Sequence, residues 1–221
     1  MIPKSQMTEE DIKHLFITPA IEANWDPTHL TMETRITDGR INLRGNLVSR
    51  ETPKKADYVL YITVNYPIAI VEAKDNNHAV SHGIQQAMLY AQMLDVPFAY
   101  SSNGDAFYEH DFLTGKERTI PLDAFPSPEE LMSRYRQGAN DGEGLNAMEE
   151  AIIHQPYYTS MKTHAPRYYQ RIAINRTLDA MARGQTRILL VMATGTGKTF
   201  TAFQIIYRAV TSGLKRKVLY S

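Results

Sequence analysis

The segment that most constrains the fold is a glycine-rich loop close to the C-terminal end of the sequence, Met192-Ala193-Thr194-Gly195-Thr196-Gly197-Lys198-Thr199. It follows the apolar run RILLVMA (187–193) and leads into the amphipathic run TFTAFQIIYRAV (199–210), after which comes KVLYS (217–221). A strand, a helix and a second strand in this order form the first unit of a parallel sheet. The C-terminal part of the chain is therefore predicted to begin a parallel α/β sheet.

The residue types in this loop suit phosphate binding. Glycines let consecutive backbone N–H groups surround phosphate oxygens, and the helix N-terminus adds a partial positive charge. Lys198 can reach the outer phosphates and the Thr199 hydroxyl can bind Mg²⁺. The generic pattern has glycine where this chain has Met192, so the alternative is an ordinary glycine turn with a solvated lysine. Upstream, the amide of Gln170 can both donate and accept, as reading an adenine edge requires, although simple packing is the alternative.

The charge distribution divides the chain into two parts. Lys plus Arg and Asp plus Glu both total 24, which gives a formal net charge of zero. Residues 160–221, however, contain eleven basic side chains and one acid, Asp179. A length of 221 residues allows one domain and part of another, at roughly 150 residues per domain. We therefore expect an N-terminal domain over 1–137, a linker over the polar, glycine-rich 138–166, and the start of a second domain over 167–221.

The N-terminal part alternates between helical and β patterns. Residues 8–24 are expected to be helical, with Thr8 and Asp11 as a capping box and Thr18 capping a segment that restarts at Pro19. Strand patterns follow at 30–36, 40–48, 57–64 and 68–74, then an amphipathic helix over 79–94 and strands at 97–102 and 106–112. This order predicts a sheet flanked by helices.

Two carboxylates and a lysine are expected at one end of this sheet. Asp57 opens one strand, and Glu72-Ala73-Lys74 closes the next across the turn at 65–67. A hairpin about that turn brings Asp57 near Glu72, and the period of two places Glu72 and Lys74 on one face. Two carboxylates and the carbonyl of Ala73 suit a Mg²⁺ ion that keeps several waters, and Lys74 could orient or deprotonate an attacking water.

The alternative for these residues is a salt bridge on an edge strand. Two observations favour a functional site. Glu72 and Lys74 interrupt the otherwise apolar run IAIVEAK, where burying a charge is costly. Other polar groups also fall in suitable places: Glu22 on the first helix could complete the metal shell, and Gln86 and Tyr90, four residues apart on the next helix, face the same way.

These motifs resemble a known family. Asp57 followed fifteen residues later by Glu72-x-Lys74 resembles the PD-(D/E)xK nuclease core, with Ala56 in place of the proline. Gln86-x-x-x-Tyr90 resembles the Q-x-x-x-Y motif of RecB-like nucleases and of type I restriction subunits. Such a nuclease followed by Arg-Tyr-Tyr-Gln and the glycine-rich loop is the arrangement of the type I restriction subunit, HsdR, a superfamily 2 DNA translocase.

The resemblance implies a fold, an activity and partners. The fold would be a restriction-endonuclease-like mixed sheet flanked by helices, followed by the first strand, helix and strand of a RecA-like parallel sheet. Cleavage of double-stranded DNA would use Mg²⁺ and the side chains of Asp57, Glu72 and Lys74, supported by Gln86 and Tyr90. Gln170 would contact the adenine of ATP, whose triphosphate would lie on the loop residues Gly195, Thr196, Gly197, Lys198 and Thr199. The partners would be the methyltransferase and specificity subunits.

The sequence sets limits on these expectations. A superfamily 2 motor needs an Asp-Glu pair and arginine fingers, which would lie beyond position 221, so we expect no appreciable ATP hydrolysis from this chain alone. The absence of cysteine excludes disulfides and thiolate chemistry. With no signal peptide or membrane span in the sequence, a cytoplasmic location is expected. The open alternatives are a DNA-binding or assembly module that does not cleave, and a nuclease-helicase of DNA repair.

Overall fold

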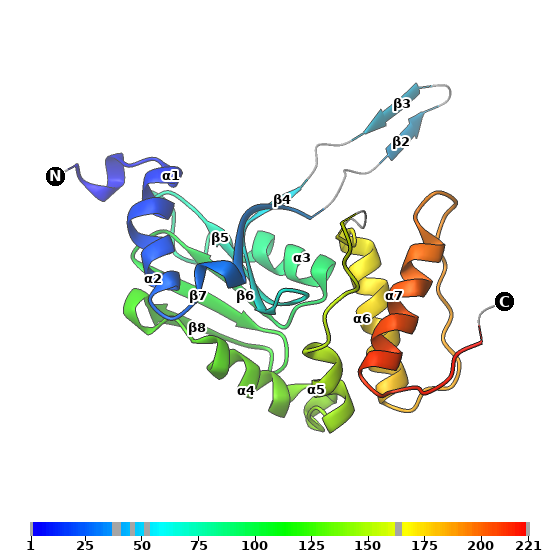
Figure 1. Cartoon of the computed structure of the whole chain (residues 1–221). Helices are drawn as coiled ribbons and strands as arrows, with labels where there is room; N and C mark the ends of the chain where they lie inside the picture. Colours follow the sequence, from blue (N-terminus) through cyan, green and yellow to red (C-terminus); the bar gives the residue numbers. More distant parts are fainter. Residues whose placement is uncertain (1, 37–40, 45–46, 51–53, 162–164, 220–221) are drawn as a thin grey trace.

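The main feature of the computed structural model is a six-stranded mixed sheet (Figure 1). The structure describes residues 2–36, 41–44, 47–50, 54–161 and 165–219. The strand order is β1-β4-β5-β6-β7-β8, with β1 at Leu30–Arg35, β4 at Lys55–Thr63, β5 at Tyr66–Ala73, β6 at Phe98–Ser102, β7 at Ala106–Asp111 and β8 at Lys116–Pro121. β5 and β6 pair in parallel and the other neighbours are antiparallel. The predicted mixed α/β fold is confirmed.

Helices cover both faces of this sheet (Figure 1). Helix α3 (Ile84–Leu94) connects the parallel strands β5 and β6 and packs on one face, where Ile70, Ala87 and Ala99 share a buried cluster. The opposite face is covered by the N-terminal helices and by α4 (Pro128–Gly138), around a cluster that includes Val71 and Leu131. Successive β5 residues thus contact opposite layers, as the period of two requires.

The N-terminal helical segment is continuous. It consists of α1 (Glu9–Ile12), a π-helical stretch (Lys13–Ile17) and α2 (Thr18–Glu22). The predicted capping box is confirmed, because Thr8 and Asp11 exchange side chain-to-backbone hydrogen bonds. The predicted cap at Thr18 is wrong: Thr18 has helical neighbours on both sides, and its hydroxyl lies 2.8 Å from the Tyr58 hydroxyl.

Several short elements differ from the sequence prediction. The strand expected at 40–48 is two strands, β2 (Ile41–Arg44) and β3 (Leu47–Arg50), which form a separate hairpin that stands away from the main sheet (Figure 1). Strand β8 was not predicted, because its polar run KERT lacks a β pattern. The helix expected from residue 79 begins at Ile84, and turns precede it. Within the described residues, 3-10 turns also occur at Lys4–Gln6, Pro27–His29, Leu122–Ala124 and Asn140–Gly142.

The predicted strands of the parallel sheet are not formed within the described residues. Residues 187–193 have no strand conformation, and Leu189 and Val191 are exposed. The same holds for 217–219, while 220 and 221 lie outside the described residues. Strands of a parallel sheet are stable when neighbouring strands and helices cover them on both faces. Within the described part of the C-terminal region, two helices accompany these segments.

Those two helices are α6 (Tyr168–Ala182) and α7 (Lys198–Thr211), which lie side by side in Figure 1. Part of the expected linker folds against them. Helix α5 (Ala147–Ile153) contributes Ile152 to a buried cluster with α6 and α7. Gln204 of α7 bonds the backbone N–H and carbonyl of Tyr158, both at 2.9 Å. The fully buried Arg208 donates to the carbonyls of Gln155 and Ile152. Residues 147–158 are therefore a structural part of this helical layer.

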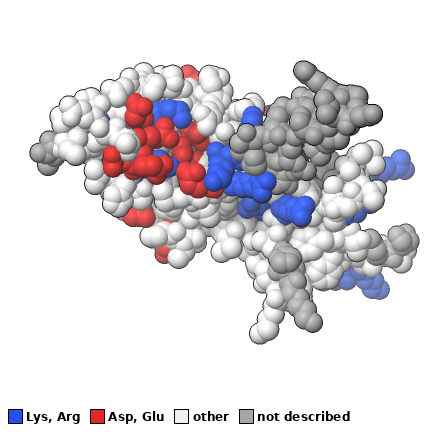
Figure 2. All heavy atoms as spheres, turned by 90° about the horizontal axis from the view of Figure 1, so that it is seen from above, with Lys and Arg blue, Asp and Glu red and all other residues white. Residues whose placement is uncertain are grey.

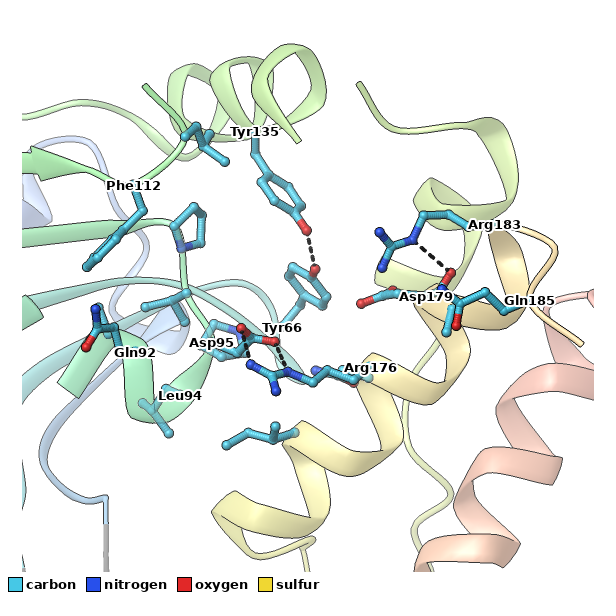
Figure 3. Close-up of a pocket in the computed structure, with 18 residues that line it drawn as sticks. Tyr66, Gln92, Leu94, Asp95, Phe112, Tyr135, Arg176, Asp179, Arg183 and Gln185 are labelled. Carbon is cyan, nitrogen blue, oxygen red and sulfur yellow. Dashed lines mark hydrogen bonds and ion pairs between the residues drawn. The ribbon is translucent and has the colours of Figure 1, made fainter. Parts of the chain in front are cut away.

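Helix α6 also contacts the sheet-bearing part of the chain. The guanidinium of Arg176 makes two bonds, of 2.7 and 2.8 Å, to the carboxylate of Asp95, which ends α3 (Figure 3). A cleft of about 560 Å³ lies between α6 and this region, with the paired hydroxyls of Tyr66 and Tyr135 on one side and Asp179 on the other (Figure 3). Burial raises the pKa of Asp179 to about 7.

Candidate active site

Asp57 and Glu72 are adjacent in the structure, as the sequence predicts. Tyr58 lies opposite Val71 in the β4–β5 pair, so Asp57 is next to Glu72 in register. The Asp57 N–H donates to Glu72 Oε1 at 3.2 Å, and the Ala73 N–H donates to Asp57 Oδ2 at 2.8 Å. Both carboxylates therefore meet at the end of β5.

The Glu72 carboxyl is buried in an unfavourable environment for a charge. The residue is 1% exposed. Its burial, followed by the nearby charge of Asp57, raises the pKa of Glu72 to about 8. A buried carboxylate of this kind becomes stable as an anion when a cation binds beside it.

Lys74 lies on the same face of the sheet as Glu72, and both side chains are close in space to Gly83, which precedes α3. A Cβ atom placed on Gly83 would lie 3.4 Å from Glu72 Cβ and 3.6 Å from Lys74 Cε. Glycine thus lets the start of α3 approach both side chains. The alternative for Lys74 was a salt bridge with Glu72 or with a neighbouring residue. Its ammonium lies 3.9 Å from Glu9 Oε2, and the described ion pairs include none between Lys74 and Glu72.

Gln86 and Tyr90 lie together on α3, on the face of the sheet that bears the carboxylates. Gln86 Nε2 donates to the Tyr90 hydroxyl at 3.2 Å. Burial raises the pKa of Tyr90; the hydrogen bond from Gln86 opposes this effect, and the nearby charges of Glu72 and Asp57 add to it. The predicted support of the site by Gln86 and Tyr90 stays a prediction.

The structure adds residues that sequence reasoning missed and moves one that it proposed. Glu22 lies exposed at the end of α2, and no described contact joins it to the carboxylates. The same helical segment instead reaches the site through its beginning, where the ammonium of Lys13 bonds Asp57 Oδ1 at 3.2 Å and Glu33 Oε1 at 2.8 Å. The sequence did contain one indication that Lys13 points inward. Lys13 is four residues before the buried Ile17, a spacing that places both residues on the same face of the helix.

The surface charge follows this arrangement. The first turn of α1 contributes the acidic residues Glu9, Glu10 and Asp11. On the face shown in Figure 2, acidic side chains gather in one area and a band of basic side chains lies directly beside it. Electropositive surface adjoining a carboxylate cluster is suited to holding a polyanion next to it.

The residues at this site fit a hard divalent cation that keeps part of its water shell. Among the described residues, no group of three or more His, Asp or Glu side chains is arranged to hold a metal ion. Mg²⁺ does not require such a group, because it is commonly bound by one or two carboxylates together with waters. Asp57 and the buried Glu72 supply those two carboxylates, and the carbonyl of Ala73 as a third ligand stays a prediction.

The glycine-rich loop has the geometry expected before a helix. Gly195 and Gly197 have positive φ angles of 79° and 80°, and α7 begins at Lys198. Gln170 lies beside the loop: its Nε2 donates to the Thr196 carbonyl at 2.8 Å, and its Oε1 accepts from the Arg167 N–H. The amide thus bonds the loop and the start of α6, and its predicted contact with adenine stays a prediction. Lys198 and Thr199 are exposed at the helix N-terminus.

Two protein families match separate parts of the chain. The family described as "Type I restriction enzyme R protein N terminus (HSDR_N)" matches residues 27–126, which contain the carboxylate cluster. The family described as "Type III restriction enzyme, res subunit" matches residues 163–220, which contain the glycine-rich loop.

Similar proteins cover almost the whole chain. The EcoAI endonuclease subunit, a type I restriction enzyme subunit of Escherichia coli, is 43% identical over 98% of this chain and 27% of its own length. The EcoKI endonuclease subunit of E. coli K12 is 26% identical over 75% of this chain and 17% of its own length. The chain therefore spans about a quarter or less of these curated relatives.

A solved structure agrees with the sequence matches. A fragment structure assigned to an HsdR subunit of a type I restriction enzyme from Vibrio vulnificus YJ016 superposes with a TM-score of 0.78 and 39% identity, over 93% of this chain and 38% of that chain. Together these matches show that the chain belongs to the N-terminal region of the type I restriction enzyme R-subunit (HsdR) family.

Proposed function

We propose that residues 1–137 form a Mg²⁺-dependent DNA endonuclease domain of a type I restriction complex. The observation that carries this proposal is the buried Glu72 carboxylate beside Asp57 and Lys74 at the end of β5. A bound Mg²⁺ ion would polarise the scissile phosphate and balance the charges of the two carboxylates. The basic band beside the acidic area in Figure 2 would hold the DNA backbone through phosphate contacts, without reading bases.

The side chains would divide the work of phosphodiester hydrolysis. Asp57 and Glu72 would bind the Mg²⁺ ion through their carboxylates. Lys74 orients or deprotonates the attacking water and offsets the negative charge that builds on the phosphorus. Gln86 and Tyr90 fix the α3 face that borders the site, through their mutual hydrogen bond.

A second part of the proposal concerns the C-terminal region. The loop from Gly195 to Thr199 would bind ATP with Mg²⁺, and Gln170 would move from the Thr196 carbonyl toward the adenine. In the complete subunit this region would belong to a motor that translocates DNA, in complex with methyltransferase and specificity subunits in the cytoplasm. In the described part of this chain, no helix is long and apolar enough to cross a membrane.

The cleavage proposal is tested with the purified chain, plasmid DNA and Mg²⁺. Wild type should cleave, while Asp57→Asn and Lys74→Ala should bind DNA normally and fail to cut it. Glu117→Gln is a matched control, since Glu117 is a surface carboxylate of the same sheet that bonds His110 and Tyr108. DNA binding with no cleavage by wild type, alone or with its partner subunits, would instead favour a non-cleaving binding module.

A further inference from the structure

One buried cation is already part of the carboxylate cluster. Lys13 is 1% exposed, and its ammonium lies 2.7 Å from Glu10 Oε1, 2.8 Å from Glu33 Oε1 and 3.2 Å from Asp57 Oδ1. It begins the π-helical stretch Lys13–Ile17, a local geometry that occurs often at functional sites. Three carboxylates from three elements thus converge on one point, and that point is occupied by Lys13 Nζ.

The backbone of β1 is distorted at the residue that completes this arrangement. Met32 lies opposite Tyr58 and Thr34 opposite Ala56, so Glu33 is at the level of Asp57. Glu33 has a φ of 51°, in the left-handed region that a residue with a side chain rarely adopts. Like charges at opposed positions of neighbouring strands repel each other. The ammonium of Lys13 bonds both carboxylates and so offsets part of that repulsion.

The two carboxylates of the cluster, Asp57 beside Lys13 (the Lys13 end) and Glu72 (the Glu72 end), differ in the cations that bond them. Asp57 shares Oδ1 with Lys13 and accepts the Ala73 N–H on Oδ2. Glu72 has one described hydrogen bond, from the Asp57 N–H at 3.2 Å, and no described ion pair of 4.0 Å or less. Asp57 is therefore in direct contact with a cation of the protein, whereas Glu72 has no such contact among the described ion pairs.

We propose that Lys13 is a positioning residue that takes the place of a second divalent cation, so that the nuclease site binds one divalent ion, at the Glu72 end. This inference rests on the proposed Mg²⁺-dependent nuclease. Without Lys13, the oxygens of Glu10, Glu33 and Asp57 would surround a space of ammonium size, with the ligand type that Mg²⁺ and Mn²⁺ prefer. Replacing Lys13 by an apolar side chain should then create a second ion site.

The test counts bound Mn²⁺ in the 221-residue chain without nucleotide, using the electron paramagnetic resonance signal of the free ion. Wild type should bind one Mn²⁺ that is lost in Glu72→Gln. Lys13→Met should bind two, and Lys13→Arg, which keeps the cation, should bind one. Lys13→Met combined with Glu33→Gln should return to one. Circular dichroism identifies variants that have lost the fold.

The outcomes separate this inference from the nuclease proposal. A folded Lys13→Met that still binds one ion would overturn the role of Lys13 and leave the nuclease proposal standing. If Lys13→Met does not fold, wild type decides the question, because two ions on wild type would overturn the inference and saturation at one would support it. Manganese binding that does not change in Glu72→Gln would overturn the metal site of the nuclease itself, and this inference with it.

Discussion

Two glutamates on the same sheet are equally buried and have opposite electrostatic environments. Glu72 and Glu109 are each 1% exposed. Glu109, on β7, accepts hydrogen bonds from Arg118, Arg134 and the Tyr100 hydroxyl. Glu72 has one described bond, from a backbone N–H.

The pKa values of the two carboxyl groups reflect this difference. Hydrogen bonds from Arg134 and Arg118 outweigh the effect of burial and lower the pKa of Glu109 to about 2. At Glu72, burial and Asp57 raise the pKa to about 8. A buried carboxylate that is bonded by several cations belongs to a structural ion-pair network, whereas a buried carboxylate with no bonded cation and a raised pKa is a candidate ligand-binding group. The predictions below test that distinction.

The largest expected effect is the loss of cleavage in Glu72→Gln. Removing one charged member of a set that acts as a unit should lower the Mg²⁺-dependent rate by at least about a thousandfold. Stability at pH 7 should be unchanged or higher, because a neutral amide is less costly to bury than a carboxyl that is partly ionised. Plasmid cleavage and urea unfolding of the same preparations measure both. A drop in stability equal to that of Glu109→Gln would contradict a purely functional role.

Glu109→Gln should have the opposite effects: a loss of stability and little change in the cleavage rate. It leaves Arg118 and Arg134 without their shared carboxylate. Because both arginines are partly exposed, the loss should be at most about 3 kcal/mol of unfolding free energy. The cleavage rate per folded molecule should stay close to wild type, because Glu109 is not among the contacts of Asp57, Glu72 or Lys74. Unfolding in urea gives the free energy, and a folded variant that has lost cleavage would show that the two clusters are coupled.

The pH dependence of stability should differ in sign between the two positions. The pKa of Glu72 is about 8 in the native state, against an ordinary value of 4.5. The contribution of Glu72 to the free energy of unfolding is therefore fully present below pH 4.5 and is lost as the pH rises through about 8. The contribution of Glu109 is present above pH 4.5 and is lost as the pH falls through about 2. Unfolding free energies of wild type and each Gln variant, compared over this pH range, measure both slopes. Parallel slopes would refute the contrast.

The smallest effect is expected at the exposed contact between the two regions. The Arg176–Asp95 pair is bidentate but largely exposed, so Arg176→Ala should lower stability by less than about 1 kcal/mol, and high salt should reduce that difference. Arg183→Ala, at a nearby exposed arginine of the α6 end, serves as a comparison. A loss as large as that at Glu109 would show that this contact holds the two regions together.

The sequence determined local structure and the chemistry of the site. The alternation of the strands and the turn at 65–67 were sufficient to place Asp57 beside Glu72, and the spacing of Gln86 and Tyr90 to place them on one helix face. Glycines, Lys198 and Thr199 after an apolar run identified the loop before α7. These features depend on periodicities of a few residues, which the sequence displays directly.

The tertiary structure decided which distant groups meet. Lys13 and Glu33 reach Asp57 through the path of a π-helical stretch and of a distorted strand, neither of which has a sequence pattern of its own. Glu22 lies exposed at the other end of the same helical segment. The apolar run 187–193 has the composition of a buried strand, yet it forms none among the described residues, because a strand requires neighbours with which to pair. Local sequence fixes what a segment is able to form, and contacts between distant segments decide whether it forms and which charges it brings together.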